Sequence, residues 1–297
     1  MPAKVSIWLS ASPSSSAPPA LPDPSLARTL SVIDTWPVPH ASAACIHASN
    51  IVTHGDIDHD FRLASISKVI TAWACLIAVE EGSVSLDDPV RPPGSTLRHC
   101  LSHAAGYGFD TQTTIIGVGK RRVYSNTGIE RAADHVADRT GITFADYLRE
   151  AIFEPLGMEA STLKTSPAYG IRSTVRDLCR FAQELMAPRL LAPQTAAAVR
   201  TVQFPELGGV IPGLGSFNPN PWGIGAEIRG DKKPHWTGTT NSPSTFGHFG
   251  GAGTMMWIDP TIDTALIALT DRAFDEWSDV ALREWPNLSD AVIATVR

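Results

Sequence analysis

A serine hydroxyl and a lysine amine stand three residues apart at Ser65 and Lys68, in a stretch whose apolar residues recur at helical spacing. Residues three apart stack on one face of a helix, so the amine can reach the hydroxyl. A serine hydroxyl is a weak nucleophile until a base takes its proton, and a desolvated amine with a lowered pKa can be that base. The spacing therefore indicates acyl transfer through a covalent intermediate, with a helix N-terminus near the developing oxyanion.

A second S-x-x-K, at Ser161 and Lys164, shows that this motif alone has little specificity. The second copy runs into a Thr-Ser-Pro sequence at residues 165–167, which is typical of a loop and offers no helix to align the two groups. We interpret it as a chance match. The alternative for the first copy is that Ser65 caps a helix and Lys68 is a solvated residue of its first turn.

Tyr124 and Asn126 form the only Y-x-N sequence of the chain and precede a predicted helix. A phenol beside a cationic lysine can have its pKa lowered enough to move protons. The structural alternative is a Tyr-Ser-Asn turn that caps the helix.

A glycine-rich sequence at residues 247–251 contains His248, Gly250 and Gly251 and precedes a predicted strand. Glycines permit close approach of the backbone to a substrate, and a backbone N–H there can polarise a carbonyl. Alone, such a sequence is more often a bulge or a turn.

The three motifs, in this order, resemble the serine β-lactamase and penicillin-binding protein superfamily, in particular its class C-like branch, which includes esterases and D-Ala-D-Ala carboxypeptidases. The likeness covers about residues 40–270. It extends to flanking sequences at residues 97–106, 124–128, 155–158, 222–225 and 253–260.

The resemblance implies a role for each motif residue. Ser65 would be the acylated serine and Lys68 its base, while Tyr124 would protonate the leaving group and activate the deacylating water. Whether Lys68 or Tyr124 removes the first proton stays open. Asn126 would hydrogen-bond a substrate amide or hold Lys68. The backbone N–H groups of Ser65 and Gly251 would form the oxyanion hole, with Gly250 beside them in the substrate-binding strand.

His248 stands where β-lactamases of this branch carry lysine, and a largely neutral imidazole attracts a substrate carboxylate less than an ammonium does. The sequence therefore favours a serine hydrolase acting on a small ester or amide substrate, most of all a β-lactamase-related esterase. One alternative is a penicillin-binding D-Ala-D-Ala carboxypeptidase or weak β-lactamase. An alternative of another class is a catalytically silent ligand-binding member of the same fold.

Composition and spacing argue against several other classes. The net charge of -6, with thinly spread Lys and Arg, gives no footprint for nucleic acid. No run approaches the ~18 to 20 apolar residues that span a bilayer. The histidines lack metal-binding spacing or, as with His99 and His103, lie in a segment that the resemblance marks as structural, so neither a metal nor a cofactor is expected. The weak N-terminal apolar stretch favours a cytoplasmic location, and the oligomeric state is left open.

Periodicity and cap signals predict the elements that must position these residues. Helices are predicted over residues 25–36, 65–81, 128–139, 143–153, 174–186, 193–202 and 289–296, and β-rich runs over 43–48, 51–53, 222–228, 254–258 and 264–269.

Sheet material thus lies at both chain ends with helices between, which indicates an α/β (α+β) fold. By the resemblance it is β-lactamase-like, with an antiparallel sheet flanked by helices and an inserted, mainly helical domain. We expect a flexible leader at residues 1–25, a sheet domain formed by residues 26–62 and 203–297, a helical domain at 63–202, and the catalytic cleft between these two domains.

Overall fold

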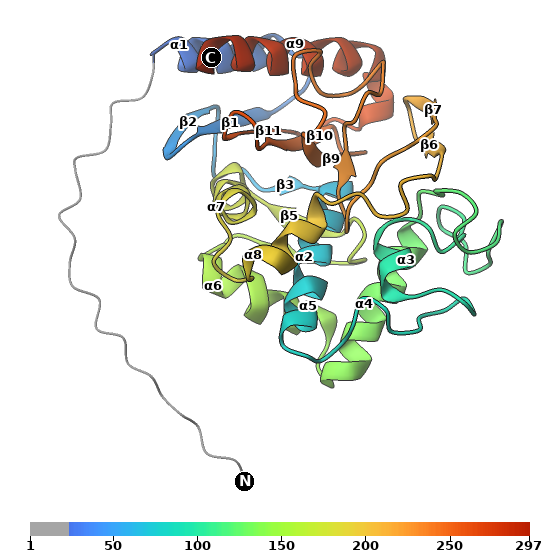
Figure 1. The fold of residues 1–297 in the computed structure, drawn as a ribbon. Coiled ribbons are helices and arrows are strands. Elements are labelled where there is room, and N and C mark those ends of the chain that lie inside the picture. The colour runs from blue at the N-terminus through green and yellow to red at the C-terminus, as the bar shows by residue number, and fades with distance from the viewer. Residues whose placement is uncertain (1–23) are drawn as a thin grey trace.

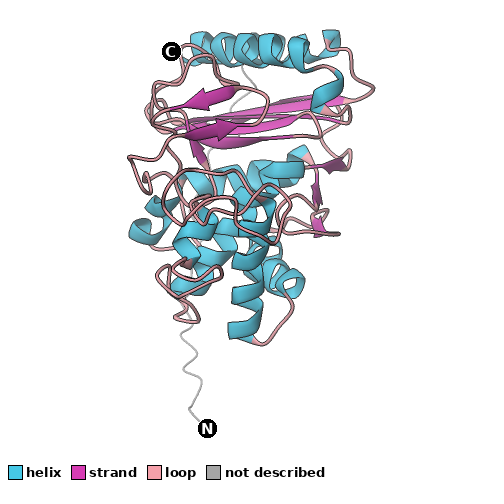
Figure 2. Ribbon diagram, turned by 90° about the vertical axis from the view of Figure 1, so that its right-hand side faces the viewer, coloured by secondary structure: helices cyan, strands magenta, loops and turns pink. Residues whose placement is uncertain are grey.

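The computed structural model describes residues 24–297, in which a six-stranded sheet lies between helices on its two faces (Figure 1, Figure 2). The leader predicted for residues 1–25 lies outside the described residues, apart from Pro24 and Ser25, which begin a helix.

The main sheet is antiparallel and is built from both ends of the chain, in the order β2-β1-β11-β10-β9-β8. Its strands are β1 (Ala41–His47), β2 (Asn50–His54), β8 (Glu227–Ile228), β9 (Phe246–Gly250), β10 (Thr254–Asp259) and β11 (Thr264–Thr270). The first and last of these strands in the chain pair directly, from Ala41 opposite Thr270 to His47 opposite Thr264. This pairing confirms the predicted sheet of two chain ends.

Both faces of the sheet are buried, and alternate residues of one strand serve two different cores. On β10, Met255 and Trp257 pack in the core beneath the N- and C-terminal helices, whereas Met256 and Ile258 pack in the core shared with the inserted helices. Burial on both faces explains why the strands read as continuous apolar runs rather than as an alternation of apolar and polar residues.

Helices form a layer on each side of the sheet (Figure 2). Helices α1 (Pro24–Leu30) and α9 (Ser278–Val296) cover one face (Figure 1). Against the other face lie the inserted helices, with α7 (Val175–Met186) directly below β1 and β11. The remaining α-helices are α2 (Ser67–Glu80), α3 (Leu97–Leu101), α4 (Asn126–Thr140), α5 (Phe144–Leu148), α6 (Glu154–Leu156) and α8 (Pro193–Ala196).

Short elements complete the described chain. Two small sheets contain β3 (Phe61–Arg62), β5 (Ile171–Ser173) and β4 (Thr162–Leu163), and β6 (Gly209–Ile211) with β7 (Gly215–Phe217). Four 3-10 turns are η1 (Ser31–Thr35), η2 (Ala64–Ile66), η4 (Ala197–Val199) and η5 (Phe274–Glu276), and η3 (Arg149–Phe153) is a π-helical turn.

Two predicted elements differ from the structure. The last helix begins at Ser278 rather than at residue 289, because burial of Trp285 and Leu288 outweighs the helix-breaking tendency of Pro286. In the run predicted as a strand over residues 222–228, only Glu227–Ile228 is a strand. Its Gly225 has φ of 78°, and a Cβ there would lie 2.1 Å from the Ala72 side chain, so this run turns tightly against α2 instead.

Other features of the chain bear on what it can do. None of the helices within residues 24–297 is long and apolar enough to cross a membrane. The four cysteines are buried free thiols, as their scattered positions indicated. The division into a sheet domain and a helical domain at the stated boundaries stays a prediction.

Candidate active site

Ser65 lies in η2, directly before α2, where tight contacts fix the chain. The preceding Ala64 has φ of 46°, a left-handed conformation that costs a non-glycine residue about 1–3 kcal/mol. Thr254 Oγ1 donates a hydrogen bond of 2.9 Å to the Leu63 carbonyl oxygen. A Cβ at Gly250 would lie 2.4 Å from that same oxygen, so only glycine lets the end of β9 approach so closely. These contacts hold Ser65 beside the sheet.

Lys68 is completely buried in the first turn of α2, and its amine is surrounded by acceptors. Nζ lies 3.1 Å from Ser65 Oγ, 2.6 Å from Asn126 Oδ1 and 3.0 Å from the Ala168 carbonyl oxygen. Burial lowers the pKa of Lys68 to about 7, and the nearby carboxylates limit the fall. When Lys68 is neutral, its two N–H bonds can serve Asn126 and Ala168, which leaves the lone pair for the Ser65 hydroxyl.

The amide of Asn126 is fixed from both sides at the start of α4. Its Oδ1 accepts from Lys68, and its Nδ2 donates to Asp110 Oδ1 at 2.8 Å. Of the two roles expected for Asn126, the structure shows the contact with Lys68. Asp110 also raises the pKa of Lys68 through its charge, so the chain of contacts from Ser65 ends in a carboxylate near the surface.

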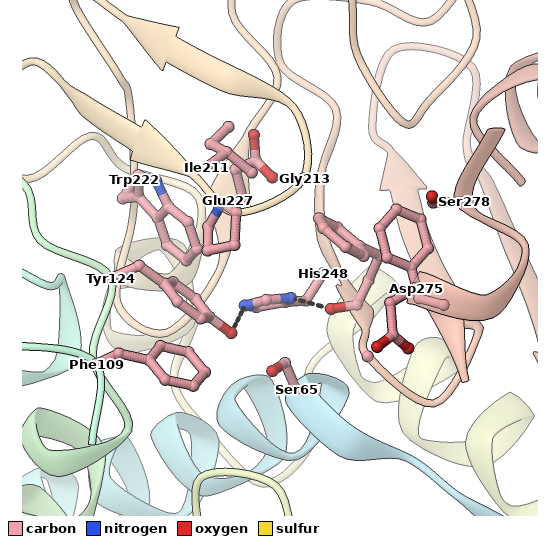
Figure 3. A pocket seen from close by; sticks show the side chains of 14 residues that line it. Ser65, Phe109, Tyr124, Ile211, Gly213, Trp222, Glu227, His248, Asp275 and Ser278 are labelled. Carbon is pink, nitrogen blue, oxygen red and sulfur yellow. Dashed lines mark hydrogen bonds between the residues drawn. The ribbon is translucent and has the colours of Figure 1, made fainter.

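Tyr124 lies above Ser65, and the two side chains line one cavity, which is described below (Figure 3). Burial raises the pKa of Tyr124 above its usual value, and the Ser65 side chain opposes this only in part. The lowered pKa predicted from the sequence is therefore wrong. Burial is not offset by the cation, because Lys68 Nζ lies under the ring face, 4.8 Å from its centroid, and contacts the ring rather than the phenol oxygen. Tyr124 is thus a neutral proton donor.

His248 on β9 holds a defined tautomer. Its Nδ1 lies 2.6 Å from the Phe249 carbonyl oxygen, which can only accept, so Nδ1 carries the proton and Nε2 is an acceptor. The Tyr124 hydroxyl donates to Nε2 at 3.3 Å. Burial, with the charge of Lys68 as a second cause, lowers the pKa of His248 to about 3. The imidazole is therefore neutral near pH 7 and helps to orient Tyr124.

Two backbone N–H groups are free to bind an oxyanion. Neither the N–H of Ser65 nor that of Gly251 has a hydrogen-bond acceptor within the described part of the chain. Gly251 follows the end of β9, which Gly250 brings against the residues before Ser65. Two such backbone donors can form an oxyanion hole, which hydrogen-bonds the negative charge that develops on a carbonyl oxygen.

A cavity of about 350 Å³ lies over these groups (Figure 3). Ser65, Phe109 and Tyr124 line it from the inserted segment. The rest of the lining comes from the C-terminal third of the chain and includes Trp222, His248 and Phe249, together with Ile211, Pro212, Phe274 and Asp275. The predicted site residues therefore meet where the two parts of the chain face each other, and the walls are mostly apolar.

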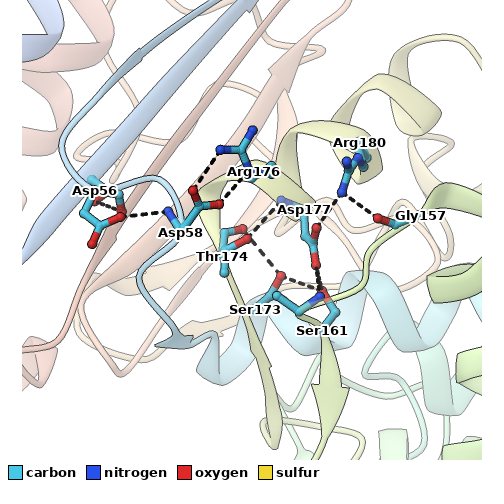
Figure 4. A network of polar contacts seen from close by, with 11 residues as sticks. Asp56, Asp58, Gly157, Ser161, Ser173, Thr174, Arg176, Asp177 and Arg180 are labelled. Atoms are coloured by element: carbon cyan, nitrogen blue, oxygen red, sulfur yellow. Dashed lines mark hydrogen bonds and ion pairs between the residues drawn. The ribbon is translucent and has the colours of Figure 1, made fainter.

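The second S-x-x-K has an unrelated environment (Figure 4). Ser161 is buried and lies directly before the short strand β4, so no helix stacks it with Lys164. Its Oγ lies 2.7 Å from Ser173 Oγ and donates to Asp177 Oδ2 at 2.9 Å. Ser161 is part of a structural network that ties β4 to α7.

Among the described residues, His40, His59 and Asp271 form a group whose ligand atoms lie within 4.8 Å of one another. His40 Nδ1 already lies 2.5 Å from Asp271 Oδ2, and the rings of His40 and His59 stack with 25° between their planes. The contacts present join the starts of β1 and β3 to the end of β11.

Sequence reasoning missed two groups at the site. Asp110 belongs to no motif, and only the structure shows that it fixes Asn126. Glu227 lines the cavity but is buried and paired, with Lys232 Nζ at 2.8 Å and His235 Nε2 at 2.9 Å from its Oε1. These two partners hold the pKa of Glu227 well below its usual range although burial alone would raise it.

Comparisons with known proteins agree with this geometry. The family model described as Beta-lactamase matches residues 52–287. A beta-lactamase from Mycobacterium bovis has a solved structure that is 47% identical, covers 90% of this chain and 99% of its own, and superimposes with a TM-score of 0.88.

More distant relatives share the fold. A beta-lactamase from Yersinia enterocolitica is 25% identical over 252 residues, which is 63% of this chain and 64% of the relative, so the match spans less than two thirds of that relative's length. The solved structure of a D-amino acid amidase from Ochrobactrum anthropi is 18% identical, with a TM-score of 0.75 over 92% of this chain and 99% of its own.

Proposed function

The chain belongs to the Beta-lactamase family, and from that membership we propose that it is a serine hydrolase that cleaves small esters through an acyl-enzyme on Ser65. One observation carries the proposal: Lys68 Nζ lies 3.1 Å from Ser65 Oγ and donates hydrogen bonds to Asn126 Oδ1 and the Ala168 carbonyl oxygen. A base held in this way can accept the serine proton without moving.

Acylation uses the groups at the start of α2. Neutral Lys68 takes the proton of Ser65 as Oγ attacks the acyl carbonyl, and the backbone N–H groups of Ser65 and Gly251 bind the oxyanion. Tyr124, a neutral phenol, gives its proton to the departing alcohol. The products of this step are an ester on Ser65, an ammonium on Lys68 and a phenolate on Tyr124, whose opposite charges stabilise each other.

Deacylation returns each proton. The phenolate of Tyr124 takes a proton from the attacking water, and the restored hydroxyl can again donate a hydrogen bond to His248 Nε2. As the acyl group leaves, the ammonium of Lys68 returns its proton to Ser65 Oγ. The directions of the two pKa shifts favour Lys68 over Tyr124 as the first base.

A second candidate is β-lactam hydrolysis, which the 47% identity to the Mycobacterium bovis protein favours. Penicillins and cephalosporins carry a carboxylate, which a cation in the cleft would recognise. The lining of the cavity in residues 24–297 contains no lysine or arginine, and His248 is neutral. We therefore place neutral esters before β-lactams.

The wild-type enzyme is expected to show a higher kcat/KM for p-nitrophenyl butyrate than for nitrocefin or for a D-Ala-D-Ala peptide. A missing charge-assisted contact to the carboxylate is worth about 1.5–3 kcal/mol, so the advantage should be roughly 10- to 150-fold. Faster nitrocefin turnover would establish the β-lactamase candidate instead. Turnover of the peptide alone would indicate a carboxypeptidase, and binding without any turnover a silent member of the fold.

The kcat/KM for p-nitrophenyl butyrate should rise with pH and level off above about 7, the pKa to which burial lowers Lys68. The sign follows from the mechanism, because neutral Lys68 is the active form and protonation removes the base. Below that pKa the rate constant should fall about tenfold per pH unit. Initial rates in buffers of constant ionic strength measure this acidic limb of the pH profile.

Asp110→Asn is the matched variant for the pH profile. It keeps an amide oxygen for Asn126 Nδ2 but removes the charge that raises the pKa of Lys68, so the limb should move to lower pH. Asp146→Asn, at an exposed acid on α5, should leave the limb in place. A pH profile whose midpoint lies far from 7, or does not move in Asp110→Asn, would contradict Lys68 as the base.

A further inference from the structure

The charges that face the cavity over Ser65 are unbalanced. Within residues 24–297 its lining includes two carboxylates, Glu227 and Asp275, and no lysine or arginine. Glu227 is buried, Lys232 neutralises its charge, and His235 is hydrogen-bonded to it. Asp275 therefore supplies the net charge that a bound substrate meets.

Asp275 is exposed and carries no hydrogen bond or ion pair to any described residue, in contrast to Asp271 and Glu276 on either side of it. Glu276 pairs with Arg272 at 3.6 Å, and Asp271 binds His40. A solvated carboxylate on an open surface is ordinary, but this one lines the same cavity as Ser65 and Tyr124. Figure 3 shows it across from Tyr124, with Ser65 and His248 between them.

The backbone fixes where this carboxylate lies. Asp275 is the middle residue of η5, and the N–H of Phe274 donates to the Gly251 carbonyl oxygen at 3.0 Å. The turn that carries Asp275 is thus hydrogen-bonded to the residue proposed for the oxyanion hole. A substrate whose carbonyl lies at Gly251 has Asp275 within reach of one of its substituents.

The other walls suit an organic cation. Phe109, Phe249 and Phe274 present aromatic surface, and ring faces attract alkylated ammonium groups while apolar walls accept their methyl groups. A free carboxylate opposite aromatic rings is complementary to a cation and repels a carboxylate.

We propose, on the basis of the hydrolysis proposed above, that Asp275 makes this site select esters that carry an ammonium group in the acyl or the alcohol part. Asp275 acts on specificity through its charge and does not take part in the chemistry at Ser65.

Two isosteric substrate pairs isolate the charge. Acetylcholine and 3,3-dimethylbutyl acetate differ only by nitrogen or carbon in the alcohol part. The p-nitrophenyl esters of 4-(trimethylammonio)butyrate and 5,5-dimethylhexanoate differ in the same way in the acyl part. The ratio of kcat/KM for the cationic to the neutral member is measured in wild type, Asp275→Asn and Asp279→Asn. Asp279 is an exposed acid in the first turn of α9, outside the cavity lining, so its variant controls for general charge and for helix stability.

We expect Asp275→Asn to lower this ratio about 2- to 5-fold for at least one pair, the effect of one exposed ion pair. Asp279→Asn should leave both ratios unchanged. The wild-type preference should also shrink between 0.1 M and 1 M NaCl, because salt screens an exposed charge.

The possible failures are distinct. If the neutral isosteres are hydrolysed in a Ser65-dependent way but neither ratio falls in Asp275→Asn, Asp275 does not select the substrate while the proposed function stands. Equal falls in Asp275→Asn and Asp279→Asn would also overturn the role of Asp275, since any acid near α9 would then serve. Absence of Ser65-dependent turnover of the neutral isosteres would overturn both proposals.

Discussion

Ser65→Ala is expected to lower kcat/KM for p-nitrophenyl butyrate by more than about 1,000-fold, since removal of a nucleophile disables covalent catalysis as a whole. The folded state should be almost unaffected. The Ser65 side chain makes no helix-capping bond but accepts a hydrogen bond from buried Lys68, so its loss should change the free energy of unfolding by no more than about 1.5 kcal/mol. Steady-state kinetics and thermal unfolding of the same preparation measure the two effects.

Ser161→Ala is the matched control, because Ser161 belongs to the other S-x-x-K of the chain. Its hydroxyl contacts Ser173 and Asp177 in a buried network away from the cavity (Figure 4). The variant should lose about 1–3 kcal/mol of stability, the cost of leaving buried partners unsatisfied, and should keep its kcat/KM. Loss of activity in Ser161→Ala with full activity in Ser65→Ala would reverse the assignment of the nucleophile.

Lys68→Met and Tyr124→Phe are each expected to lower kcat/KM about 100- to 10,000-fold, the range for a positioned proton-transfer group. Methionine fills the buried space of Lys68 but cannot accept a proton, and phenylalanine keeps the ring of Tyr124 while it removes the hydroxyl. Lys68→Arg should be as inactive as Lys68→Met, because a guanidinium keeps its proton at every practical pH.

The double variant Lys68→Met/Tyr124→Phe separates a shared proton path from independent roles. Both residues act on the protons of one reaction at Ser65, so the combined loss should be much smaller than the product of the two single losses. Losses that multiply in full, in a double variant that still unfolds cooperatively, would contradict the coupled mechanism.

The fold was predictable from sequence where one pattern determined one element. Apolar runs identified β1, β10 and β11, and helical spacing identified α2, α4 and α7. Prediction failed where tertiary packing outweighed local preference. Pro286 concealed the first half of α9, whose Trp285 is buried against the sheet. The run around Trp222 has strand composition, but Gly225 turns it against α2.

The candidate site was predictable in its members more than in its electrostatics. Spacing and resemblance brought together Ser65, Lys68, Tyr124 and His248, which line one cavity or contact its lining. The pKa of Tyr124 is raised because the phenol is buried, while the amine of Lys68 lies under the ring face, and no sequence pattern encodes either feature.

The remaining groups were out of reach of sequence patterns for a related reason. Asp110 lies in a loop without a motif and fixes Asn126 through a hydrogen bond. The free carboxylate of Asp275 lies at the cavity because η5 is hydrogen-bonded to the backbone of Gly251. In both cases the role arises from a contact between segments far apart in the chain.

Mass spectrometry after exposure to a fluorophosphonate tests the nucleophile most directly, since the reagent forms a stable adduct only with an activated hydroxyl. Wild type should gain one adduct, located by peptide mapping on Ser65, and should react more slowly below pH 7 as Lys68 becomes protonated. Ser65→Ala should gain none, whereas Ser161→Ala should react like wild type. An adduct on another residue, or one that persists in folded Ser65→Ala, would contradict acyl-enzyme formation at Ser65.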